Sequence, residues 1–149
     1  MKIKIIIFSA LFLTGCINAP IKIKGDIQAT IDINPNYKGQ AAPLQLKIYY
    51  LKNSKRFMSA SYRQLVNRPY RTLGKDLTGS RTIIVRPGQR IPFSASINKN
   101  TRYLGFIANY RKLRHKKWRW LFTISIFRNE TMTVRVMRQG IRVSRPIIE

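Results

Sequence analysis

The sequence predicts a mainly β protein: an antiparallel β-sandwich of seven to eight strands with a short helical insertion after the second strand. Two observations carry this prediction. Apolar and polar side chains alternate in several short segments, and turn residues such as Asn-Pro and Pro-Gly separate them. One further segment carries apolar residues at helical spacing. The chain has 149 residues and no internal repeat, so a single domain is expected.

The first fifteen residues have the features of a secretion signal. Lys2 and Lys4 form a positive region, and residues 5–13 form an apolar stretch. This stretch is too short to cross a bilayer as a helix, which takes about 20 apolar residues. The next residues complete the sequence Leu-Thr-Gly-Cys, which matches a lipobox. In a lipobox the cysteine, here Cys16, takes a diacylglyceryl group on its thiol and an acyl chain on its freed amine.

Cys16 is therefore expected to become the lipidated first residue of a mature protein; a buried cysteine after an apolar strand is the disfavoured alternative. Several acyl chains hold a protein on a membrane because each buried CH₂ contributes roughly 0.8 kcal/mol. Ile17, rather than an aspartate, follows the cysteine, which points to the outer membrane. The chain thus divides into a signal peptide (1–15), a lipidated N-terminus and tether (16–21) and a β-sandwich domain (22–149). The covalent lipid is the only non-protein group expected.

The first predicted strand covers residues 21–33. One face of it is apolar, with Ile21, Ile23, Ile27, Ala29, Ile31 and Ile33. Residues 34–43 break the alternation with Asn-Pro, Gly39 and Pro43, which indicates a loop. A connection of this length exceeds an ordinary hairpin turn and often carries function. A second strand follows, with the apolar residues Leu44, Leu46, Ile48 and Tyr50.

The helical insertion is expected at residues 55–66, with Ser54 as its cap and with Pro69 and Gly74 ending the region. Its apolar stripe consists of Met58, Tyr62, Leu65 and Val66. Further strands are expected at 82–86, 91–97, 103–110, 118–126, 132–136 and 141–143. The segments 118–126 and 132–136 are expected to pair as a hairpin around a turn at 128–130.

Residues that commonly carry catalysis are scarce. The chain has one histidine, one cysteine and five acidic residues. Asp26 and Asp32 lie six residues apart on one strand face, which separates them by roughly 20 Å. Paired glycosidase carboxylates lie only about 5–9.5 Å apart. No metal-binding or phosphate-loop motif occurs. We therefore expect no enzyme, no metal site and no small-molecule substrate.

The charge is strongly basic, at +24 with 29 Lys and Arg, and favours anionic partners such as acidic proteins, phospholipids, lipopolysaccharide or nucleic acid. One segment near Trp118 and Trp120 is especially basic, with Arg111, Lys112, Arg114, Lys116, Lys117 and Arg119. Such a segment can grip phosphates and stack bases. A secreted chain meets little nucleic acid, so we interpret the tryptophans as core, and the cations and His115 as a solvated face.

A series of segments resembles the TssJ family, the outer-membrane lipoproteins of type VI secretion systems. The resemblance covers nearly the whole mature chain, through LTGC, NPNYKGQAAPLQLKIYYLK, RFMSASYRQLV, LGKDL, VRPGQR and YLGFIANYRKLRHKKWR. These segments are similar to the family's lipobox, its loop and second strand, its helix, its turn and its YR…WR element. The chain departs from the family in its very basic surface and in Lys112, where many members have an acid.

The resemblance implies a transthyretin-like sandwich that is not an enzyme. Family members bind the periplasmic domain of TssM, a large inner-membrane protein, and so hold the membrane complex to the outer membrane. The loop between the first two strands is implicated in that contact, and here it comprises Asn34, Pro35, Asn36, Tyr37, Lys38, Gly39, Gln40, Ala41 and Ala42. Tyr37 is the natural aromatic anchor, unless its ring folds back on the sandwich.

Two other functions stay open at this point. The cationic surface could bind an anionic glycan or lipid, or the sandwich could serve as a chaperone or enzyme inhibitor, because a fold does not fix a function. If the loop does not contact the partner, the basic segment 111–119 is the next candidate.

Overall fold

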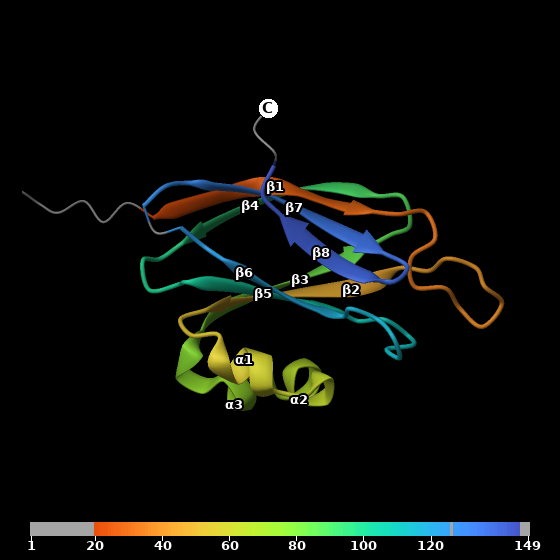
Figure 1. The fold of residues 1–149 in the computed structure, drawn as a ribbon, viewed down its shortest axis with the longest axis horizontal. Coiled ribbons are helices and arrows are strands. Elements are labelled where there is room, and N and C mark those ends of the chain that lie inside the picture. Colours follow the sequence, from red (N-terminus) through yellow and green to blue (C-terminus); the bar gives the residue numbers. More distant parts are fainter. Residues whose placement is uncertain (1–19, 126, 147–149) are drawn as a thin grey trace, which may run out of the picture.

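The computed structural model describes residues 20–125 and 127–146, and the signal peptide and Cys16 lie outside them. Two four-stranded sheets face each other, and three short helices cover the outer face of the second sheet (Figure 1). The elements are β1 (Ile21–Ala29), β2 (Leu44–Leu51), α1 (Lys55–Ser59), α2 (Tyr62–Asn67), α3 (Pro69–Leu73), the 3₁₀ turn Gly74–Asp76, β3 (Leu77–Val85), β4 (Arg90–Ile97), β5 (Tyr103–Ala108), β6 (Arg119–Thr123), β7 (Glu130–Met137) and β8 (Gly140–Ser144).

The first sheet has the order β4-β1-β7-β8, and the second has the order β3-β2-β5-β6. All neighbouring strands are antiparallel except β1 and β7, which run parallel from the pair Ile23 and Glu130 onward. The predicted mainly β sandwich is confirmed, with eight strands among the described residues and a helical insertion after the second strand.

The core lies between the sheets and is built by the alternation that the sequence shows. Ile23 and Ile27 of β1 are fully buried, whereas Lys22 and Lys24, on either side of Ile23, are exposed. The facing sheet contributes Leu46 and other inward side chains. Trp118 and Trp120 are partly buried and pack against this core, as the sequence predicted.

A second apolar cluster attaches the helical insertion to the outside of the second sheet. Phe57, Leu65 and Leu73 supply one fully buried side chain from each helix. The ring of Phe57 lies against Gly105 of β5, where a Cβ atom would come within 2.7 Å of two ring carbons. The sheet can receive the insertion there because residue 105 has no side chain.

The insertion differs from the single helix predicted at 55–66. The chain breaks at Ala60, and Ser61 caps α2 with a full capping box to Gln64, so two helices replace one. Phe57 takes the buried position, and Met58 is 47% exposed. Pro69 does not end the region but begins α3, where its missing N–H costs nothing.

Two further predictions were wrong. The first strand ends at Ala29, and Ile31 is 81% exposed because residues 31 and 32 form a turn. The segments 118–126 and 132–136 do not form a hairpin: β6 pairs with β5 in one sheet and β7 with β1 and β8 in the other. Alternation places a side chain on a face, but it does not choose the partner strand.

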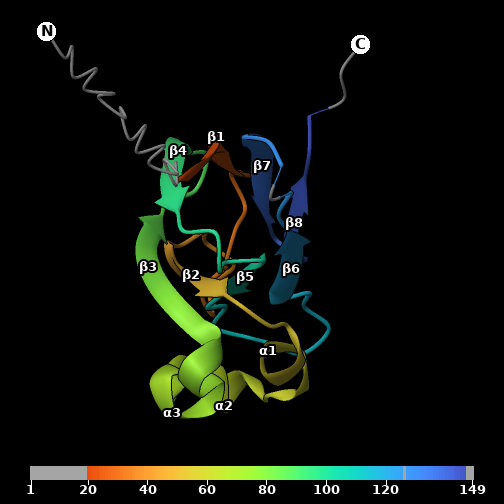
Figure 2. The ribbon, with the colours of Figure 1, turned by 90° about the vertical axis from the view of Figure 1, so that its left-hand side faces the viewer.

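The strand β1 spans the sandwich and separates two ends. We call one the tether end; it contains the start of β1, the connection 98–102 and the described residues of the β6–β7 connection (Figure 1). Arg145 belongs to this end because it donates to Thr123 and Glu130, at the two ends of that connection. The opposite end, here the loop end, contains residues 30–43, the connection 109–118 and the β7–β8 turn. Figure 2 looks onto the tether end and shows the helices on the far side of the second sheet from β1.

Candidate functional site

The loop 34–42 is held at its base by Asn34. This residue is only 4% exposed and has a left-handed backbone, with φ of 47°. Its side-chain amide donates to the Pro43 carbonyl at 2.7 Å, and its side-chain oxygen accepts from the Arg111 amide at 2.8 Å. Asparagine adopts this conformation more readily than most residues. The side chain thus fixes the loop to the segment that follows β5.

The tip of the loop is closed by Asn36. Its side-chain oxygen accepts from the backbone amides of Lys38 and Gln40, and its backbone amide donates to the Gln40 carbonyl at 2.8 Å. Gly39, with φ of 78°, completes the turn. The tip is therefore a small hydrogen-bonded unit that holds its shape without a partner.

Tyr37 projects from this tip, with 86% of the residue exposed. The Lys38 ammonium lies 5.6 Å from the centroid of the Tyr37 ring. The alternative in which the ring folds back on the sandwich is therefore not what the structure shows. An exposed aromatic side chain on a pre-ordered loop loses little entropy when a partner covers it.

A cleft of about 310 Å³ separates the loop from the basic segment. Its walls come from the loop and from three other places in the chain: Asn34, Pro35, Asn36, Tyr37, Gly39, Tyr110, Lys112, Lys116 and Arg138. The structure thus brings the two candidate regions together at the loop end. The charged residues of the cleft wall are all cations, which favours an acidic group as occupant.

The basic segment lies beside this cleft as a tight connection rather than a strand. Arg111, Lys112, Arg114 and Lys117 are exposed. Lys116 is partly buried, donates to the Arg138 carbonyl and lies 5.8 Å from the Tyr110 ring centroid. His115 is exposed and has φ of 61°, as a turn residue does.

Arg119 lies apart from the other cations of the segment. Its guanidinium donates to the carbonyls of Phe57 and Ala60, both at 2.9 Å, and its central carbon lies 4.8 Å from the Trp118 ring centroid. Burial lowers the pKa of this guanidinium, which nevertheless stays charged at neutral pH. Arg119 therefore fastens the helical insertion to β6 and is not part of the cationic surface.

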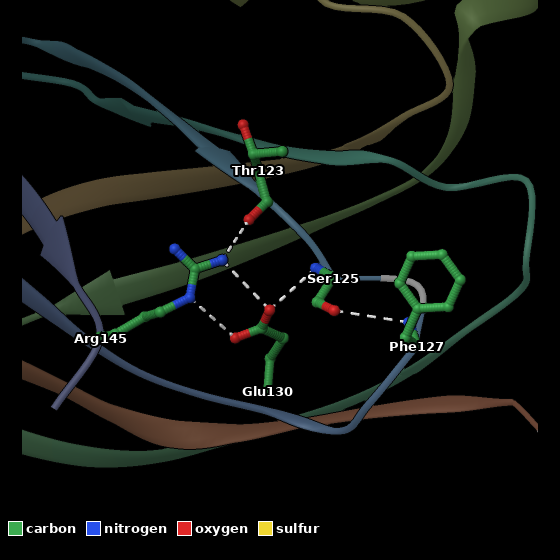
Figure 3. A network of polar contacts seen from close by, with 5 residues as sticks. All are labelled: Thr123, Ser125, Phe127, Glu130 and Arg145. Atoms are coloured by element: carbon green, nitrogen blue, oxygen red, sulfur yellow. Dashed lines mark hydrogen bonds and ion pairs between the residues drawn. The ribbon is translucent and has the colours of Figure 1, made fainter. Parts of the chain in front are cut away.

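The best-buried carboxylate, Glu130, belongs to a closed network at the tether end. Arg145 donates to both of its oxygens at 3.1 Å and to the Thr123 carbonyl at 2.8 Å, and the Ser125 amide donates to Glu130 at 2.8 Å (Figure 3). Burial raises the pKa of Glu130, but these hydrogen bonds outweigh it and hold the pKa below its ordinary value. The network ties the end of β8 to the β6–β7 connection.

Asp26 is also held in hydrogen bonds and an ion pair. Its carboxylate accepts from Gln28 and Thr133 and pairs with Arg90 at 2.5 Å. Burial raises the pKa of Asp26, but these contacts together lower it by more, so the net pKa is below the ordinary value. Within the described part of the chain, no group of three or more His, Cys, Asp and Glu residues could hold a metal ion.

Two residues of the cleft were not predicted from the sequence. Tyr110 is the last residue of the strand expected at 103–110, but it lies just past β5 and donates from its hydroxyl to the Met137 carbonyl at 2.7 Å. Burial raises the pKa of this hydroxyl. Arg138 lies in the turn between β7 and β8. Only the strand order, which places that turn beside the loop, could have located it.

Residues 21–139 match the family model described as "Type VI secretion lipoprotein, VasD, EvfM, TssJ, VC_A0113". A search of curated proteins gives no match. Among solved structures, the T6SS lipoprotein TssJ1 from Pseudomonas aeruginosa is 31% identical, with a TM-score of 0.83 over 87% of this chain and 99% of that chain.

Two more distant structures share the fold. Serratia marcescens Lip, "a membrane bound component of the Type VI Secretion System", is 22% identical, with a TM-score of 0.79 over 87% of this chain and 99% of that chain. A chain in the structure described as "T6SS protein TssM C-terminal domain (869-1107) from EAEC" is 19% identical, with a TM-score of 0.72 over 85% of this chain and 98% of that chain.

Proposed function

This chain belongs to the type VI secretion lipoprotein family, and from that premise we propose that it is a non-enzymatic anchor of the type VI membrane complex at the outer membrane. Acyl chains on Cys16 hold the tether end to the membrane. The loop 34–42 binds the periplasmic domain of a TssM-type inner-membrane protein. No helix among the described residues has the length and apolar character needed to cross a membrane.

The observation that carries this proposal is the placement of the loop relative to the tether. The chain enters the sandwich at Ile21, at one end of β1, and the loop follows the other end (Figure 1). Nine strand residues span roughly 30 Å. A protein lipidated just before Ile21 therefore presents the loop well away from the membrane, where a partner that crosses the periplasm can reach it.

The chemistry of the loop end supports a protein partner. Tyr37 offers a large amphipathic side chain of the kind that dominates interface energetics. Lys112, Lys116 and Arg138 attract an acidic side chain into the neighbouring cleft. A fold-related chain occurs in a structure described by the name of a TssM C-terminal domain, which supports a partner of this type. We therefore expect the partner to contribute a pocket for Tyr37 and a carboxylate beside it.

The anchor half of the proposal is tested by Cys16→Ser. This variant lacks the acceptor thiol, so we expect it to leave the membrane fraction and to abolish secretion. A variant that stays in the outer membrane and supports full secretion would contradict the anchor role. Ile17→Asp is the matched control for location, because it leaves the thiol in place and is expected to move the lipidated protein to the inner membrane.

The binding half is tested by co-purification with the periplasmic domain of the TssM-type protein. We expect Tyr37→Ala to weaken binding at least tenfold, a typical effect for a buried aromatic anchor. Tyr70→Ala is the matched control, because Tyr70 is 74% exposed but lies on the helical insertion. Equal binding by both variants would place the contact elsewhere, and Lys112→Glu would then test the basic segment.

A second function is favoured by one observation on the helical insertion. A concavity of about 480 Å³ there is lined by Arg56, Arg68 and Arg71 with uncharged residues. Such a surface suits an anionic glycan or lipid head group. Binding of a sulfated glycan should then fall steeply with salt, because exposed charges are screened over about 8–10 Å. Replacing Arg68 and Arg71 with Ala would abolish glycan binding and leave the TssM-type partner bound.

A further inference from the structure

The tether end carries the most exposed large apolar side chain of the described residues. Phe127 is 91% exposed, on the connection between β6 and β7. Of the other exposed large apolar residues, Ile31 and Tyr37 lie at the loop end, Met58 and Tyr70 lie on the insertion, and Ile84 lies in β3. Burying a phenylalanine side chain is favourable by about 2 kcal/mol. A surface that covered Phe127 would therefore gain binding free energy from it.

Hydrogen bonds position the Phe127 connection beside the start of β1. The Phe127 amide donates to the Ser125 hydroxyl at 3.4 Å, as Figure 3 shows. The Asn129 side chain accepts from the Lys22 amide at 3.0 Å, two residues after the described chain begins. The point at which the tether enters the sandwich and the exposed ring are therefore on the same end of the molecule.

The tether end is cationic, and its buried acid is neutralised. The connection 98–102 is joined to the β6–β7 connection by the Ile124 amide, which donates to the Arg102 carbonyl at 2.9 Å. Glu130 is buried and paired with Arg145. The cationic residues of the tether end are Lys22, Lys99, Arg102, Arg128 and Arg145. An exposed apolar side chain on a cationic end is the composition of surfaces that bind anionic lipid.

The tether is short enough to keep the tether end close to the membrane. Five peptide units join Cys16 to Ile21, and a fully extended chain spans at most about 3.6 Å per residue, or roughly 18 Å. The tether end cannot therefore move farther than this from the lipidated residue. The loop end lies another sandwich length away and cannot reach the same surface while the tether end faces it.

We propose that the tether end rests on the membrane, with Phe127 inserted at the boundary between head groups and acyl chains and with the cations of the tether end on anionic phospholipid head groups. This inference rests on the proposed lipidation of Cys16 and deepens it. The acyl chains hold the protein at the membrane, and the Phe127 contact sets its orientation. The loop end then points toward the periplasm in every anchored copy, so each copy presents the loop in the orientation that the partner can bind.

The test uses the full lipidated chain, purified from membranes and reconstituted into vesicles of phosphatidylethanolamine with phosphatidylglycerol. Lipid occupies the thiol of Cys16, the only cysteine, so Phe127→Cys provides a single site for a polarity-sensitive fluorophore. Tyr37→Cys, at the loop end and almost equally exposed, is the matched control. We expect a blue shift and loss of most of the emission to lipid-attached quenchers at position 127, and an aqueous, unquenched spectrum at position 37.

Flotation of the same vesicles separates the two possible failures. If the protein floats and the label at 127 stays in water, the orientation is wrong and the lipid anchor stands. If the protein does not float, the anchor is wrong, and this inference falls with it. Equal quenching at 127 and 37 would also overturn the inference, because it would mean that the sandwich has no preferred orientation.

The charge contribution is tested in the same reconstituted system. Arg128→Glu should reduce the quenching at position 127 on anionic vesicles, whereas Arg68→Glu, on the insertion, should leave it unchanged. Vesicles of phosphatidylcholine alone should give weaker quenching than anionic vesicles. Equal quenching on both lipids would overturn the role given to the cations.

Discussion

Asn34 determines how the loop is held, because its side chain makes two hydrogen bonds from a left-handed backbone conformation. We consider Asn34→Ala, which removes both bonds and leaves a Cβ residue at φ of 47°. Each bond contributes about 1 kcal/mol, and the left-handed conformation costs alanine about 1 kcal/mol. The expected loss of unfolding free energy is therefore about 3 kcal/mol.

Asn34→Gly is the matched comparison, because glycine loses the same two hydrogen bonds but accepts the left-handed backbone. Its expected cost is about 2 kcal/mol, from the hydrogen bonds alone. Equilibrium urea unfolding, followed by far-ultraviolet circular dichroism, measures both variants against the unaltered protein. A cost below about 0.5 kcal/mol for either variant, the usual scatter of surface substitutions, would refute the role assigned to Asn34.

Three further predictions concern the scaffold. Gly105→Ala forces a Cβ atom against the Phe57 ring and should cost about 1–3 kcal/mol in the same unfolding assay; no cost would show that the insertion moves freely. Arg119→Met leaves two insertion carbonyls without their donor and should cost about 2 kcal/mol, whereas the exposed Arg114→Met should cost almost nothing. The folded-state pKa of Glu130 is depressed, so the carboxylate stabilises the fold fully above its unfolded-state pKa of about 4.5, and this stabilisation is lost as the pH falls through the folded-state pKa. Glu130→Gln should therefore flatten the acid limb of a curve of unfolding free energy against pH. An unchanged acid limb would contradict the network of Figure 3.

The strands could be predicted because each of them obeys a local rule. Ile23 and Ile27 are buried as period two requires, and Pro87-Gly88 turns the chain between β3 and β4. Ile31 broke the rule because strand length is set by the partner strand: β1 pairs with β4 only as far as Gln28. The periodicity continued past the point at which pairing stopped.

The site was only half predictable, for the same reason. Loop length and turn residues identified 34–42 as a candidate, and charge identified 111–119. That these two regions line one cleft depends on the Asn34 contact to Arg111, a pairing of residues far apart in the chain. Arg119 shows the converse: its charge suggested a surface role, and only the packing of the insertion reveals that its guanidinium is used internally.

Site-specific photo-crosslinking in cells tests the central claim most directly. A photoreactive amino acid replaces Tyr37 at the loop end or Phe127 at the tether end, two positions of nearly equal exposure. We predict a crosslink to the TssM-type protein from position 37 and none from position 127. A crosslink to that protein from position 127, with none from position 37, would contradict the assignment of the loop end to the partner and the tether end to the membrane.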